Sequence, residues 1–202
     1  MTGLDELELD ALTEIFNVGV GLAADALHQM LGEHIPLSVP QVELTSQRHA
    51  QEQFVARAQN DLCVVRQTYT GEFTTEALLV FADSDSLKLV RMMVGVDLPA
   101  DELSALRQDA LGEMGNIVLN AVISNLSTSL SLPLEGSIPQ VNETTAARLF
   151  GHDANATEAP GSQVLALMID FALSSQNIQA HLVFLLDTAS TAQLRQYLAR
   201  SM

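Results

Sequence analysis

Three polar residues in the stretch DALTEIFN, residues 10–17, have types and a spacing that could support chemistry. Asp10, Glu14 and Asn17 stand at positions i, i+4 and i+7, which an α-helix stacks on one face. A carboxylate can pair with a Lys or Arg of a partner, and a carboxamide can hold a water molecule because it both donates and accepts hydrogen bonds. This line of side chains therefore favours a binding or water-positioning site over a nucleophilic one.

The same line of residues occurs again 99 positions later, in the stretch DALGEMGN. Asp109, Glu113 and Asn116 keep the residue types and the spacing of the first copy. Asn is a poor residue for the middle of a helix, because its amide competes with the hydrogen bonds of the backbone. Its presence three residues after Glu in both copies is difficult to assign to chance, so we interpret each Glu and Asn as a functional pair.

Simpler explanations exist for the acidic positions. An Asp near the start of a helix stabilises it by about 0.3–1 kcal/mol, which would account for Asp10 and Asp109. A single Glu is most often part of a solvent-facing surface, which would account for Glu14 and Glu113. The retention of the whole pattern in two copies outweighs these explanations for the Glu and Asn pairs.

The strands that follow the two helices repeat as well. The stretch SVPQVE matches SIPQVN at the same offset of 99, so Pro40 and Pro139 lie at equal distances beyond Asn17 and Asn116. Each half alone has too few strands to cover a long helix. We therefore predict a single domain made of two similar halves: residues 1–202 overall, divided into about 1–99 and 100–202.

Hydrophobic periodicity and turn residues indicate the elements that must position these side chains. Gly32 and Gly95 can each end a helix in the left-handed conformation. Pro36 and Pro40 confine their strand to a sheet edge, and DSDS offers N-cap residues before a short helix. Expected helices span 4–31, 87–94, 102–130 and 192–200; expected strands span 34–46, 61–71, 73–82, 132–142, 164–173 and 178–186; 96–102 is an expected connector and 150–162 an expected surface loop.

The two long helices differ beside their Asn residues. The first copy continues as NVGVG and the second as NIVLN. Gly19 and Gly21 each cost about 1 kcal/mol relative to Ala inside a helix, which indicates close approach of another segment or of a partner. Asn120 is a candidate for an additional hydrogen bond at the second copy.

Composition argues against several classes of function. Of the 202 residues 48% are hydrophobic, which is enough for a sizeable core. A net charge of -16 without a Lys or Arg cluster argues against a nucleic-acid partner and disfavours anionic membrane surfaces. The N-terminus does not resemble a signal peptide, and no apolar run could span a bilayer, so we expect no membrane insertion and a cytoplasmic location.

Motifs for a complete active site are not found in this sequence. The single cysteine, Cys63, permits no multi-thiolate metal site and is expected to be a small buried residue. The sequence contains no G-x-x-x-x-G-K-[ST], no G-x-S-x-G and no H-E-x-x-H. We therefore expect no metal site and no cofactor of its own, and a chain that inserts a water-positioning amide into the active site of a partner.

The pattern Asp-x-x-x-Glu-x-x-Asn, followed by Pro after twenty-two intervening residues, resembles the signature of the CheC/CheX/FliY phosphatases of bacterial chemotaxis. Both copies fit this signature completely, and the resemblance covers nearly the whole chain. It implies the fold of that family, an α+β fold with a pseudo-two-fold internal repeat, in which two long helices pack on a largely antiparallel sheet.

Members of that family hydrolyse the phosphoaspartate of the response regulator CheY, and the resemblance implies the same reaction here. Asn17 and Asn116 would each orient a water in line with the phosphorus, while Glu14 and Glu113 would each bind a lysine of the regulator. The Mg²⁺ of the reaction would belong to the regulator. The receptor deamidase CheD is a further candidate partner, which no residue of this sequence identifies.

A non-catalytic alternative is a flagellar-switch or adaptor module that binds the phosphorylated regulator without hydrolysing it. The two intact Glu and Asn pairs favour the enzyme, because a module that only binds has no need for an amide aimed at phosphorus. The sequence does not decide whether both sites are active.

Overall fold

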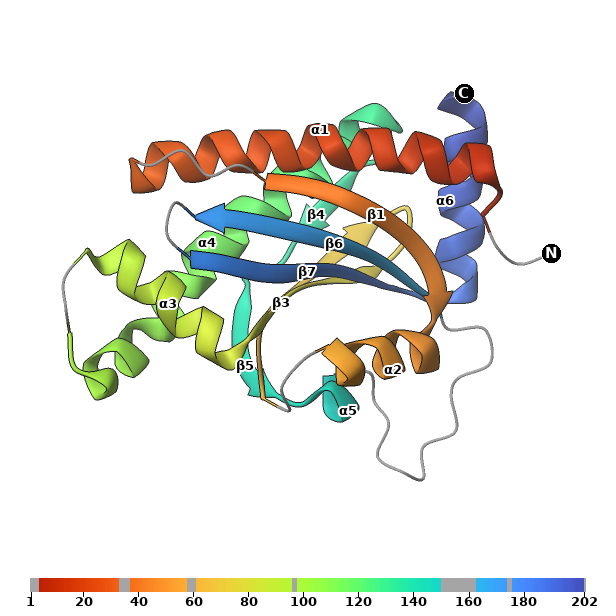
Figure 1. The fold of residues 1–202 in the computed structure, drawn as a ribbon. Coiled ribbons are helices and arrows are strands. Elements are labelled where there is room, and N and C mark those ends of the chain that lie inside the picture. Colours follow the sequence, from red (N-terminus) through yellow and green to blue (C-terminus); the bar gives the residue numbers. More distant parts are fainter. Residues whose placement is uncertain are drawn as a thin grey trace.

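The structure is a computed structural model that describes residues 4–32, 37–57, 61–95, 98–149, 163–173 and 176–201. Within these ranges the chain forms one antiparallel sheet with helices on both faces (Figure 1). The helices are α1 (Glu6–Leu31), α2 (Gln47–Arg57), α3 (Asp83–Val94), α4 (Ala100–Ser129), α5 (Ala146–Leu149) and α6 (Thr188–Ser201). The strands are β1 (Leu37–Ser46), β2 (Leu62–Gly71), β3 (Thr75–Ala82), β4 (Leu134–Gly136), β5 (Gln140–Thr144), β6 (Gln163–Leu173) and β7 (Gln176–Leu186).

The strand order of the sheet is β1-β6-β7-β3-β2-β4, and β5 also pairs with β2. Every one of these pairings is antiparallel, which confirms the predicted α+β class. β1 forms an edge, as Pro40 requires, and its register shifts between Ser38 and Gln41 on either side of that proline. Pro36 lies outside the described residues.

The order of strands has a symmetry that an internal duplication would produce. When β2 is exchanged with β6, β3 with β7, and β1 with the β4 and β5 pair, the result is the same strand order read from the opposite edge of the sheet. Each half also begins with a long helix, α1 or α4, and ends with the helix α3 or α6. The duplication itself, and the single domain of two halves, stay predictions.

α1 is amphipathic and well capped. The Asp5 side chain accepts from the Glu8 backbone N–H at 2.9 Å, and the Glu8 side chain accepts from the Asp5 N–H at 2.8 Å, which forms a capping box. Gly32 ends the helix with φ of 72°, as predicted. One stripe of α1 is buried, and it contains Leu12, Phe16, Val20, Ala23 and Leu27.

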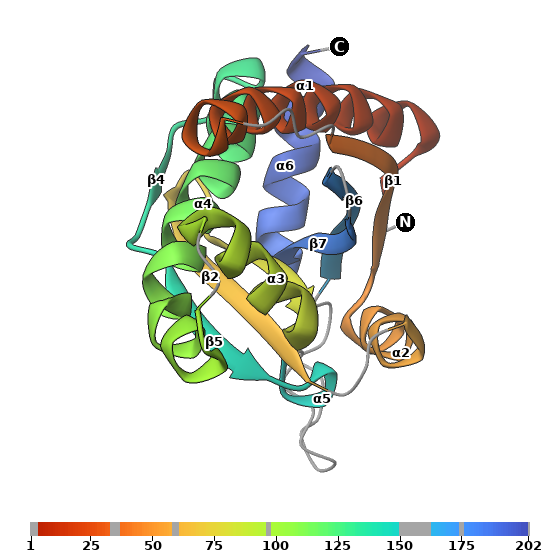
Figure 2. The same ribbon diagram turned by 60° about the vertical axis from the view of Figure 1, so that its left-hand side comes forward.

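The main core lies between one face of the sheet and α1, α3, α4 and α6 (Figures 1 and 2). Phe16 of α1 stacks on Phe184 of β7 with ring centroids 5.5 Å apart. Cys63 is fully buried in this core and burial raises the pKa of its thiol, so the prediction of a small buried residue is confirmed. The opposite face carries a smaller cluster beneath α2 and α5, formed by Ala50, Leu62, Val64, Leu78, Val80, Ala146, Leu149, Val164 and Val183.

α1 and α4 pack directly on each other. A Cβ at Gly19 would stand 3.0 Å from the Cα of Val122, so this glycine permits the close approach that the sequence predicts. The Asn125 Nδ2 group donates to the Ile15 carbonyl at 2.7 Å and joins the two helices further. A Cβ at Gly21 would meet nothing within 4 Å, so no described segment explains that glycine.

Ion pairs formed by two arginines connect the helices to neighbouring elements. Arg107 of α4 is buried and donates to Asp83 at 2.6 Å and to Glu143 at 2.7 Å, which ties α4 to the start of α3 and to β5. Arg195 of α6 donates to the buried Glu8 at 3.1 Å, which ties α6 to α1. Arg107 thus connects α4 to the sheet, and Arg195 connects α1 to α6.

The predicted boundaries were wrong at several points. α2 was not predicted, because its sequence is mostly polar and, of the side chains described there, only Ala50 is fully buried. α3 begins at Asp83, so the DSDS residues form its first turn, and its N-cap, Ala82, makes no side-chain cap. α4 begins at Ala100 and includes the end of the expected connector. The expected loop 150–162 lies outside the described residues.

Candidate functional site

The polar residues of the second copy, Asp109, Glu113 and Asn116, form what we call the second polar line, and they face a groove beside α4. Asp109, Glu113 and Asn116 line this groove together with Pro139, and its volume is about 470 Å³. The buried residues Leu111 and Val118 hold the opposite side of the helix in the core. The structure therefore brings all four predicted residues of the second copy to one place. The remaining lining residues are Gln108, Gly112, Gly136, Ser137 and Ile138.

The far wall of the groove is the segment 136–139, which β2 holds in place. The Ser137 N–H donates to the Thr68 carbonyl at 2.8 Å, and the Thr68 N–H donates to the Ser137 hydroxyl oxygen at 3.1 Å. The Gln67 Nε2 group donates to the Ser137 carbonyl at 2.7 Å. A Cβ at Gly136 would lie 2.8 Å from Gln67 Nε2 and from Tyr69 Cε1, so any other residue there would require one of these side chains to shift.

The Asn116 side chain is half-buried, and a neighbouring residue of the same helix holds its oxygen. The Asn120 Nδ2 group donates to Asn116 Oδ1 at 2.7 Å. The Tyr69 hydroxyl donates to Asn120 Oδ1 at 2.9 Å, and burial raises the pKa of Tyr69, so the phenol keeps the proton that it donates. The expected hydrogen bond from Asn120 is confirmed, and Tyr69 and Gln67 are supporting residues that sequence reasoning missed.

The two carboxylates of the groove are exposed. Neither Asp109 nor Glu113 forms an ion pair or a side-chain hydrogen bond with any residue that the structure describes. Asp109 is nine residues beyond the first residue of α4, so the helix-start explanation of this Asp was wrong. Two uncompensated negative charges in a groove can attract a cationic group of a partner.

The first polar line lies on the exposed face of α1. Asp10, Glu14 and Asn17 are all exposed, and their side chains make no hydrogen bond or ion pair within the described ranges. Asp10 lies beyond the first turn of the helix, where the dipole effect has faded, so the helix-start explanation was wrong here too. Pro40 lies in β1, which packs against α1, and only the backbone of this proline is described.

Exposed apolar residues accompany both polar lines. Val18 and Leu22 of α1 are 48% and 49% exposed, and Val18 follows Glu14 by one helical turn. Ile138, on the rim of the groove, is 85% exposed, and Leu106 of α4 is 38% exposed. Large apolar side chains exposed beside polar groups are typical of surfaces that contact another protein. Sequence reasoning missed Ile138, because exposure of one residue in an extended segment has no periodic signal.

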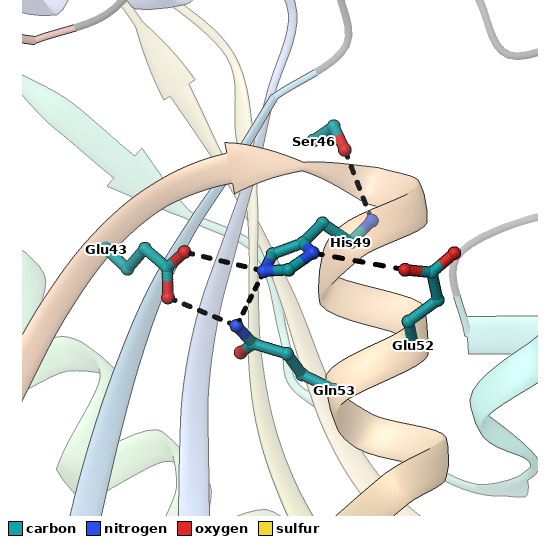
Figure 3. A network of polar contacts seen from close by, with 5 residues as sticks. All are labelled: Glu43, Ser46, His49, Glu52 and Gln53. Atoms are coloured by element: carbon teal, nitrogen blue, oxygen red, sulfur yellow. Dashed lines mark hydrogen bonds and ion pairs between the residues drawn. The ribbon is translucent and has the colours of Figure 1, made fainter.

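A second polar cluster surrounds His49 where β1 meets α2 (Figure 3). His49 Nε2 lies 3.9 Å from a Glu43 carboxylate oxygen, and Nδ1 lies 4.0 Å from Glu52. The His49 backbone N–H donates to the Ser46 hydroxyl oxygen at 3.2 Å, which caps the first turn of α2. The His49 side chain is 51% exposed and its ion pairs are long, so the cluster accounts for the start of α2 and not for a site.

The described residues also bear on metal binding and on membrane spanning. No group of three or more His, Cys, Asp or Glu side chains there is arranged to hold a metal ion. No described helix combines the length and the apolar character needed to cross a membrane.

Comparison with known proteins agrees with the resemblance seen in the sequence. The model of the CheC-like family matches residues 7–44, which include the first polar line and Pro40. The CheY-P phosphatase CheC of Bacillus subtilis is 24% identical over 202 residues, which cover 95% of this chain and 94% of that protein. The predicted resemblance to the chemotaxis phosphatases is confirmed.

Solved structures show the same fold. The crystal structure of FliY from Thermotoga maritima has a TM-score of 0.77 and 21% identity, and covers 98% of this chain and 99% of its own. A chain of the CheX-CheY-BeF3-Mg²⁺ complex from Borrelia burgdorferi is a more distant neighbour, with a TM-score of 0.50 and 15% identity over 90% of this chain and 97% of its own.

Proposed function

We propose that this chain is a phosphatase that hydrolyses the phosphoaspartate of a CheY-type response regulator. The observation that carries the proposal is the groove of α4, where a positioned amide, Asn116, lies beside an uncompensated carboxylate, Glu113. The similarity to a protein named CheY-P phosphatase supports the choice of reaction.

The chemistry of phosphoryl transfer fits such a small set of groups. The transferring phosphoryl group needs an attacking water in line with the leaving oxygen and a cation against its developing charge. We assign the water to the amides of Asn17 and Asn116, and assign the pairing with a regulator lysine to Glu14 and Glu113. The Mg²⁺ would be held by the regulator, and the neighbour whose name contains CheY, BeF3 and Mg²⁺ supports that division.

The proposal extends to both halves of the chain. Asp10 and Pro40 would support the first site as Asp109 and Pro139 support the second, within one domain of two similar halves. We place the reaction in the cytoplasm, where the regulator would be found. CheD stays an expectation from the family resemblance, with no described residue that selects it.

Adding this chain to a phosphorylated CheY-type regulator is expected to accelerate the loss of phosphate. The expected acceleration is about 10-fold or more over spontaneous decay, because a positioned water replaces one that must be oriented from solvent. The measurement is release of inorganic phosphate with and without the chain, at equal Mg²⁺. A regulator whose phosphorylated Asp is replaced by Asn serves as the control.

The adaptor hypothesis gives a different result in the same assay. An adaptor would bind the regulator loaded with beryllofluoride, a mimic of the phosphoryl group, and leave the decay of the phosphorylated form unchanged. That combination of binding without acceleration would overturn the proposed function.

A further inference from the structure

We infer that Asn120 is a positioning residue that fixes the amide of Asn116 in one orientation, with its NH2 group directed to the groove. The catalytic consequence of this orientation rests on the proposed function. The orientation itself is a property of the chain alone, and it follows from a series of hydrogen bonds that begins on β2.

The series has a defined direction because its first acceptor is a backbone carbonyl. The Ser137 carbonyl can only accept, so the group of Gln67 at 2.7 Å must be its NH2 group. That same NH2 group lies 3.2 Å from Asn120, which must therefore present its oxygen. Asn120 then has its own NH2 group on the other side, where it meets Asn116 at 2.7 Å.

The last member of the series is the amide that lines the groove. Since Asn120 donates to it, Asn116 directs its oxygen to Asn120 and keeps its NH2 group for the groove. An NH2 group in this place can donate to the oxygen of an attacking water and leave another lone pair of that water for the phosphorus. Without the series, rotation of the amide by a half turn would exchange a donor for an acceptor.

The base of the series is rigid and protected from water. Gln67 and Tyr69 are each 2% exposed, and Tyr69 donates a second hydrogen bond to the Asn120 oxygen at 2.9 Å. The Gln67 Oε1 atom is buried without a hydrogen-bond partner among the described residues. A buried acceptor left unpaired costs free energy, so the two bonds of the Gln67 NH2 group must outweigh that cost.

Among the described residues of the first copy, no side chain supports Asn17 in this way. Gly21 stands where the second copy has Asn120, at the offset of 99 residues, and Asn17 makes no side-chain hydrogen bond with a described residue. Asn116 is therefore oriented before a partner binds, whereas Asn17 must be oriented during binding. The two sites therefore carry the same residue types and differ in whether the Asn amide is oriented before a partner binds.

The test replaces Asn120 with Asp in a chain that also carries Asn17→Ala, so that only the second site acts. Asp keeps the shape and still accepts from Tyr69 and Gln67, but it cannot donate to Asn116. Asn116 must then rotate and direct its oxygen to the groove. We expect kcat for phosphate release to fall about 10- to 100-fold while KM changes by less than about twofold.

A matched control is Asn125→Asp in the same background. Asn125 lies on the same helix and donates to the Ile15 carbonyl, away from the groove. This control loses one partly buried donor in the same way, and its kcat is expected to stay at the value of the Asn17→Ala parent. A second readout is the side-chain amide signal of Asn116 in ¹H–¹⁵N spectra of the chain alone, which should move in Asn120→Asp and not in Asn125→Asp.

The inference is overturned if Asn120→Asp retains the kcat of its parent and the Asn116 amide signal does not move. Failure of the proposed function is recognised separately, since the Asn17→Ala parent would then fail to accelerate phosphate loss at all. In that case the amide signals alone decide the orientation, and an unmoved signal still overturns it.

Discussion

Replacing both asparagines, Asn17→Ala with Asn116→Ala, is expected to return phosphate release to the spontaneous rate of the regulator. Each substitution removes an amide that orients water, and Ala can neither donate nor accept a hydrogen bond. The expected loss is the whole acceleration given by the wild-type chain, about 10-fold or more. The measurement is single-turnover phosphate release at a chain concentration that saturates the regulator, so that binding does not limit the rate.

The contrasting variant is Glu14→Gln with Glu113→Gln, which removes both charges and keeps both shapes. A charge-assisted hydrogen bond contributes about 1.5–3 kcal/mol, so affinity for the beryllofluoride-loaded regulator should fall about 10- to 100-fold. The double Asn variant should keep the affinity of the wild type. Retention of full phosphatase activity by the double Asn variant would contradict the assignment of the amides.

A second large effect is expected at Gly115, where α4 meets β2. A Cβ at this position would overlap Cγ1 of Val65 and lie 2.9 Å from Val65 Cβ. Val65 is fully buried, so neither side can yield without a shift of the helix or the strand. Gly115→Ala should lower the free energy of unfolding by about 1–3 kcal/mol, measured by urea denaturation.

Gly21→Ala is the matched control for that substitution. Both glycines lie inside long helices, but a Cβ at Gly21 meets nothing within 4 Å. Ala is favoured over Gly by about 1 kcal/mol in a helix interior, so Gly21→Ala should raise the free energy of unfolding. Equal effects of the two substitutions would show that contact with Val65 does not restrict position 115.

The main elements of the fold could be predicted because their signals are local. The buried stripe of α1 repeats at helical spacing, and Gly32 and Gly95 end their helices with φ of 72° and 69°, a conformation that glycine adopts without strain. Pro40 placed β1 at an edge because a proline cannot donate to a neighbouring strand. α2 was missed because its burial depends on the sheet beneath it and not on a periodic pattern of its own.

The sequence predicts the residues of the candidate site that face the surface, but not the residues that support Asn116 from within the fold. The polar lines are visible because their spacing matches one helix face. The support of Asn116 depends on Gln67 and Tyr69, which reach Asn120 across 53 and 51 positions of sequence. Which face of β2 meets α4 is set by strand register and helix packing, and neither can be read from a single stretch of sequence.

The most direct test of the central claim is a crystal structure of this chain bound to a regulator that carries beryllofluoride and Mg²⁺. We expect α4 to lie across the phosphorylation site, with the Asn116 amide close enough to hold a water in line with the beryllium and the phosphorylated Asp. We also expect Glu113 to pair with a lysine of the regulator. A complex in which the regulator docks elsewhere, with both polar lines facing solvent, would refute the proposed phosphatase mechanism.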